Sequence, residues 1–158
     1  MNLRQRRRLD MPRHRFITPE EQKQIDAILR EFLKNSDAKT ALLLDKGGFL
    51  MSVQGFTEHL DPQTIAVLAA GSFATTRELA KLIGEEAFTV MFHQGRRDNI
   101  HISAVGKDAL MVIIFENTTT IGMVRLFARD TAKKLEAILE TINQRKSKAP
   151  MGNIPVQK

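Results

Sequence analysis

Residues 61–84 constrain the fold more than any other part of the sequence. Asp61 is a typical helix N-cap, and Pro62 suits the first helical position, where no N–H donor is needed. Gly84 is a typical C-terminal stop, because glycine adopts the left-handed conformation without a steric penalty. No charged residue occurs between Asp61 and Arg77. The segment therefore predicts one long helix that is uncharged over most of its length.

This predicted helix has two uncharged faces when its residues are plotted at 100° per residue. One face carries most of the large side chains: Ile65, Leu68, Ala69, Ser72, Thr76, Leu79 and Ile83. The opposite face is built from smaller side chains: Val67, Ala70, Gly71 and Ala74. A surface helix needs only one apolar face, so the second face is either buried in the same domain or available for docking. A small domain has few elements to cover it, which favours docking.

The chain of 158 residues predicts a single domain with two basic ends. Residues 1–17 carry a net charge of +5 and residues 143–158 carry +4, whereas residues 18–142 carry −3. We therefore expect a disordered basic arm over 1–17, a folded domain over 18–145 and a flexible basic tail over 146–158. Basic arms of this kind bind nucleic acid or anionic lipid, or are simply solvated. The acidic domain argues against nucleic acid as the main partner.

The sequence offers no recognisable catalytic or cofactor motif. It has no cysteine, which excludes thiol chemistry and disulfides, and no glycine-rich loop followed by Lys-Ser/Thr for binding nucleotide phosphates. No signal peptide or membrane-spanning run is evident, so we expect a cytoplasmic protein. His93 and His101 are expected to face each other across a hairpin. Without a third ligand, this pair predicts an ordinary cross-strand contact and no metal site.

The remaining pattern predicts an α+β fold with the order αββαβββα. Helices are expected over residues 19–35, 61–84 and 121–144, and strands over 38–45, 49–54, 88–94, 100–105 and 109–115. Residues 40–44 and 109–115 are continuously apolar, which is typical of central strands covered on both faces. We expect a five-stranded antiparallel sheet with the middle helix on one face and the terminal helices on the other. The apolar strand 88–94 would form an exposed edge, which a second copy would cover.

Three segments together resemble the Roadblock/dynein light chain family, and within it the bacterial MglB-like branch. They are AAGSFATTRELAKLIGE on the middle helix, FHQG ending the next strand and ALMVIIFENTTTIGMVRLFA leading into the last helix. The resemblance covers residues 18–144. It implies a profilin-like fold and a homodimer with one continuous sheet and adjacent middle helices. It also implies a small Ras-like GTPase partner, whose GTP hydrolysis the dimer stimulates by reordering the GTPase's own residues.

The resemblance also assigns residues to two surfaces. The partner-binding surface would consist of Gln63, Val67, Ala70, Gly71, Ala74, Glu78 and Lys81. The dimer interface would consist of Leu68, Thr75, Leu82, Thr89, Met91 and His93. Two departures from the family pattern are visible: Glu78 stands where a small residue would continue the strip, and the tail is basic where MglB-like relatives carry an acidic extension.

These observations favour a dimeric, non-catalytic regulator of an MglA-type GTPase. Because the GTPase supplies the chemistry, an arginine finger is not required, although Arg77, Arg96 and Arg97 are candidates. The alternatives are a scaffold dimer that assembles other proteins without activating a GTPase, and a nucleic-acid-binding protein that uses its basic arms. No cofactor or metal is expected in any of the three.

Overall fold

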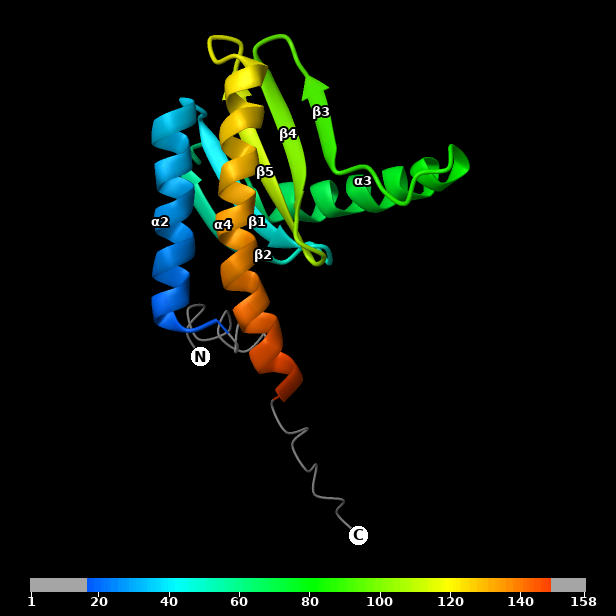
Figure 1. Cartoon of the computed structure of the whole chain (residues 1–158). Coiled ribbons are helices and arrows are strands. Elements are labelled where there is room, and N and C mark those ends of the chain that lie inside the picture. The colour runs from blue at the N-terminus through cyan, green and yellow to red at the C-terminus, as the bar shows by residue number, and fades with distance from the viewer. Residues whose placement is uncertain (1–16, 149–158) are drawn as a thin grey trace, which may run out of the picture.

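The computed structural model describes residues 17–148 and has the predicted element order (Figure 1). The elements are α2 (Pro19–Ser36), β1 (Thr40–Asp45), β2 (Leu50–Gly55), α3 (Pro62–Leu82), β3 (Val90–Gln94), β4 (Asp98–Val105), β5 (Ala109–Glu116) and α4 (Ile121–Lys148). The predictions made for residues 1–16 and 149–158 concern segments outside the described residues.

The strands form one antiparallel sheet in the order β2-β1-β5-β4-β3. This confirms the predicted central pair, because β1 and β5 are neighbours and almost every residue in them is buried. It also confirms that β3 is an edge strand. Tight turns join β1 to β2 and β4 to β5, and tight turns require antiparallel pairing.

Helices cover both faces of the sheet, as predicted (Figure 1). α2 and α4 pack on one face, where Ala41 and Leu43 of β1 join their apolar residues in one core. α3 lies on the other face, where Leu42 and Leu44 of the same strand join a second core. Successive strand residues point to opposite faces, so the apolar run in β1 supplies both cores. Among residues 17–148, no helix is long and apolar enough to cross a membrane.

A partly buried ion pair joins the start of α2 to the end of α4. Thr18 and Glu21 form a capping box, in which each side chain accepts a hydrogen bond from the other residue's backbone N–H. The Arg145 guanidinium donates to both Glu21 carboxylate oxygens, at 2.9 and 2.8 Å. These hydrogen bonds lower the pKa of Glu21 to about 2, despite the opposing effect of burial. The first turn of α2 is thereby fixed against α4.

The predicted pairing of His93 with His101 is wrong by one residue. Phe92 lies opposite His101, and His93 lies opposite Ile100. A slip of one residue moves a strand's side chains to the other face of the sheet. Phe92 consequently lies beside Phe115 on the α4 side, with ring centroids 6.0 Å apart. The error arose from placing Phe92 on the same face as Ile102, which in fact packs on the α3 side.

Candidate functional site

The face of α3 that contacts the sheet is made mostly of small residues. Ala66, Ala69, Ala70 and Phe73 are buried there against the large side chains of β1 and β5. Asp61 caps the helix by accepting a hydrogen bond from the Thr64 N–H, at 3.2 Å, as its position predicted. The strands already fill the space between the layers, so alanines suffice on the helix.

Apart from Phe73 and Ile65, the large apolar residues of α3 and its C-cap consequently point away from the sheet. The exposed fractions are 53% for Val67, 67% for Leu68, 55% for Leu79, 83% for Leu82 and 67% for Ile83. At Leu68, Leu79 and Ile83 the face of large side chains therefore does not pack on the sheet, because helical periodicity gives two faces without saying which one the sheet takes. Of the predicted second face, Val67, Gly71 and Ala74 are uncovered within the described residues, whereas Ala70 is buried.

Six of the seven predicted partner-binding residues lie exposed on α3: Gln63, Val67, Gly71, Ala74, Glu78 and Lys81. Ala70 is the exception, since it is 6% exposed and packs in the protomer's own core. This burial argues against a contact of Ala70 with a partner. Glu78 and Lys81 form an ion pair at 3.1 Å on the exposed surface. A side chain added at Gly71 would meet open space, so this glycine leaves a shallow, uncovered position.

The predicted dimer residues divide in the same way. Leu68, Thr75, Leu82, Thr89 and His93 are exposed on α3 or at the sheet edge. Met91 is only 9% exposed and belongs to the core beneath α3, which argues against a place in a dimer interface.

Met91 also shows how α3 is placed under the edge of the sheet. Its sulfur accepts a hydrogen bond from the Thr76 hydroxyl, at 2.9 Å. α3 therefore passes beneath β3 near Thr76, and its last turns extend beyond that strand (Figure 1). Leu79 and Leu82 lie in these last turns, where residues 17–148 supply no further strand to cover them. The outer edge of β3 likewise has no neighbouring strand in the described part of the chain.

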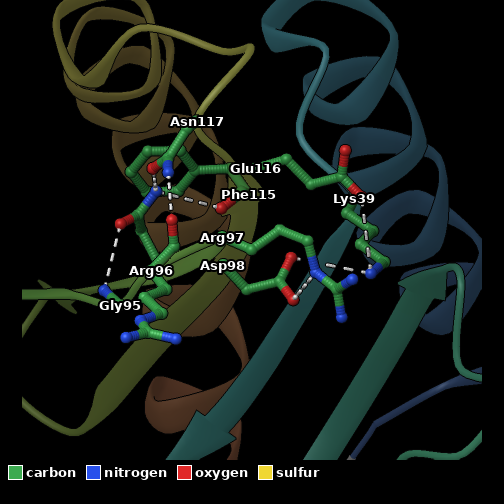
Figure 2. Close-up of polar contacts among 9 residues, drawn as sticks. Lys39, Gly95, Arg96, Arg97, Asp98, Phe115, Glu116 and Asn117 are labelled. Carbon is green, nitrogen blue, oxygen red and sulfur yellow. Dashed lines mark hydrogen bonds and ion pairs between the residues drawn. The ribbon is translucent and has the colours of Figure 1, made fainter.

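Two asparagines that sequence reasoning missed hold the β3–β4 loop in place (Figure 2). Asn99 accepts a hydrogen bond from the Gly95 N–H at 3.3 Å and donates to the Asn117 side-chain oxygen at 2.8 Å. Asn117 in turn donates to the Arg96 carbonyl oxygen at 2.6 Å. A Cβ at Gly95 would lie 2.4 Å from the Asp98 carbonyl oxygen, so this position requires glycine. No local pattern marks the asparagines, because Asn99 and Asn117 bond to each other across 18 residues and Asn117 reaches Arg96 across 21.

The loop presents two arginines at the end of the sheet. Arg96 and Arg97 are both exposed, and the Arg97 Nε lies 3.9 Å from an Asp98 carboxylate oxygen. Lys39 forms ion pairs with Asp98 and Glu116 at 3.6 and 3.7 Å, beside the loop (Figure 2). The tip of the loop is therefore exposed to solvent, while a role of either arginine as an arginine finger stays a prediction.

The two histidines considered for a metal site are held apart by the sheet. His101 is 1% exposed beneath α4, whereas His93 is exposed on the other face. Burial lowers the pKa of His101 to about 4, and the charge of Arg125 contributes less. Within residues 17–148, no three histidine, cysteine or acidic side chains gather as metal ligands would.

Comparison with known proteins identifies the fold at family level. Residues 24–115 match the model of the Roadblock/LC7 domain. The chain belongs to the Roadblock/LC7 domain family. This confirms the resemblance read from the three sequence segments.

Solved MglB structures are similar to this Roadblock chain over most of their length. MglB from Myxococcus xanthus is 38% identical, covering 79% of this chain and 94% of that one, with a TM-score of 0.75. The gliding protein MglB from Thermus thermophilus is 31% identical, covering 78% and 94%, with a TM-score of 0.74. A third structure, described as MglB with a tetrameric arrangement, is 31% identical, covers 79% and 94% and has a TM-score of 0.75.

The comparison also supports the predicted likeness to profilin. Profilin IB from Acanthamoeba castellanii is 12% identical, covers 71% of this chain and 96% of that one, and has a TM-score of 0.54. At that identity the likeness concerns the fold alone. The Roadblock chain therefore has a profilin-like arrangement of one sheet between helical layers.

Proposed function

We propose that this Roadblock protein is a dimeric, non-catalytic regulator of an MglA-type small Ras-like GTPase in the cytoplasm. The observation that carries the proposal is the outward orientation of Leu68, Leu79 and Leu82 on α3. Burying one leucine side chain contributes about 1.5–3 kcal/mol, so three exposed on one helix favour association strongly. Similarity to MglB at up to 38% identity supports the choice of partner class.

The proposed dimer uses the edge strand and the outer face of α3 together. Pairing of β3 with its copy would satisfy the outer backbone groups of the edge strand, and Thr89 and His93 lie exposed there. Leu68, Thr75 and Leu82 would then be covered by the neighbouring α3. Buried Met91 is left out of this interface, since it already packs within its own protomer.

The proposed GTPase surface is the flank of α3 that carries Val67, Gly71 and Ala74. These side chains are small or short, so a partner's backbone can approach the helix closely. Gln63 at the start of the flank donates a hydrogen bond to the Gly48 carbonyl oxygen, at 2.9 Å, which ties the flank to the β1–β2 turn. The Glu78–Lys81 ion pair lies at the other end of this flank.

The experiment is a GTP hydrolysis assay with a purified MglA-type GTPase. Ala74→Arg places a long charged side chain on the flank and should abolish stimulation while leaving the fold intact. Ala27→Arg, at an exposed alanine of α2, is the matched control and should retain stimulation. Unchanged stimulation by Ala74→Arg would contradict the assigned surface. Equal binding to the GDP and GTP forms, without stimulation, would instead indicate a scaffold dimer.

A further inference from the structure

A groove of about 530 Å³ lies at the end of the sheet opposite the β3–β4 loop. The turns between β1 and β2 and between β4 and β5 form two of its walls, and the C-terminal half of α4 forms a third. Its apolar lining includes Ile17, Met51, Val105, Leu139 and Ile142. The groove is separate from the α3 surface, and the proposed function leaves it without a role.

The chain enters the domain through this groove. Ile17 is part of its lining, and the next residues begin α2 at the capping box of Thr18 and Glu21. The Arg145–Glu21 ion pair fixes that first turn against α4. Residues 1–16 are therefore joined covalently to the groove wall. A segment tethered this closely has an effective concentration on the order of millimolar, so weak contacts suffice to hold it.

The α4 wall of the groove carries acidic side chains that lack basic partners in the described part of the chain. Glu136 and Glu140 are one turn apart, and neither forms an ion pair with any of residues 17–148. Like charges at this spacing destabilise a helix by a few tenths of a kcal/mol, so a nearby cation would be favourable. Lys46 and Lys107 lie on the two turns, and Lys146 lies on α4 beyond Glu140, so the acidic part of the α4 wall is the stretch from Glu136 to Glu140.

Residues 1–16 have the composition that this groove requires. They contain six arginines and a single acidic residue, together with the apolar residues Leu9, Met11 and Phe16. Residues 149–158 fit less well, because Lys158 is their only charged residue. They also follow the last turns of α4, which extend beyond the sheet (Figure 1).

We infer that residues 1–16 dock in this groove of the same chain. Their apolar side chains cover the floor, and their arginines pair with Glu136 and Glu140. This arrangement replaces the solvated arm that composition alone predicts. It also joins the start of α2, both turns and the end of α4 into one unit.

The absence of cysteine makes a direct test practical, because one introduced cysteine can carry a nitroxide spin label. A label at Gln5→Cys should broaden the amide NMR signals of Val105 and Leu139 and leave that of Ile121, at the other end of α4, unchanged. Diluting the labelled chain into unlabelled chains shows whether the effect stays within one chain. Absence of broadening in the groove, or broadening that comes from a neighbouring chain, would overturn the inference. So would equal broadening from a label at Lys158→Cys.

A pair of matched variants tests the charge contribution. Glu136→Gln combined with Glu140→Gln should reduce the broadening from the Gln5→Cys label severalfold. Glu31→Gln, at an exposed acidic residue of α2, should leave it unchanged. Both positions of the double variant are exposed, so the fold should persist. Broadening that survives in the double variant would overturn the proposed pairing with arginine.

Discussion

The two faces of the sheet are completed in different ways. On the α2–α4 side, large residues from both layers interdigitate, and Leu29, Phe32 and Leu135 are at most 2% exposed. On the α3 side, the helix contributes chiefly alanines to the core and keeps its leucines on the surface. The first face of the sheet is therefore fully covered by helices of the same chain. The second combines a closely docked helix with a surface suited to a partner, which is what large exposed apolar patches indicate.

Two leucine substitutions would sharpen this comparison most. Leu135→Ala should lower the free energy of unfolding by about 3 kcal/mol, because it leaves a cavity in a closed core. Leu82→Ala should change it by less than about 0.5 kcal/mol at protein concentrations low enough to dissociate a dimer. Urea titrations of both variants measure the difference. Equal losses in the free energy of unfolding would mean that the two leucines are equally buried, which would contradict the comparison.

A smaller effect is expected at the ion pair that joins the ends of α2 and α4. Glu21→Gln should cost about 1.5 kcal/mol at neutral pH, since it removes a charge-assisted contact from a mostly buried carboxylate. The pKa of Glu21 is lowered to about 2. Its stabilising contribution is therefore present above the ordinary pKa of 4.5 and is lost as the pH falls toward 2. A cost that stays constant across this range would contradict the assignment.

The smallest expected effect concerns the loss of folding stability in acid that arises from His101, on the α2–α4 side of the sheet. Burial lowers the pKa of His101 to about 4, so the unfolded chain takes up a proton more readily than the folded chain. Wild-type stability should therefore fall as the pH decreases from the ordinary value of 6.5 toward 4. His101→Leu should reduce this loss by about 0.7 kcal/mol near pH 6, as measured by urea titration. An unchanged pH profile would mean that His101 is not the group responsible.

Most of the fold could be predicted from the sequence because its signals are local. The N-cap at Asp61, the capping box at Thr18 and the apolar runs in β1 and β5 placed elements and sheet order correctly. Each of these depends on residues only a few positions apart.

The errors concern choices that local patterns leave open. The rotation of α3 depended on which strand side chains already filled the core, so Ala70 was assigned outward and Leu79 inward. The facing of β3 depended on one residue of register, so His93 was paired with the wrong neighbour. The burial of Met91 could not be predicted, because it depends on the passage of α3 beneath β3, a contact between distant parts of the chain. Asn99 and Asn117 were missed for the same reason.

The central claim is that a second copy of the chain covers the outward leucines of α3. Sedimentation equilibrium of the wild type, beside Leu68→Ser combined with Leu82→Ser, tests it most directly. The account predicts twice the protomer mass for the wild type and the protomer mass for a double variant that remains folded. A wild-type protein that stays at the protomer mass at high micromolar concentration would contradict it.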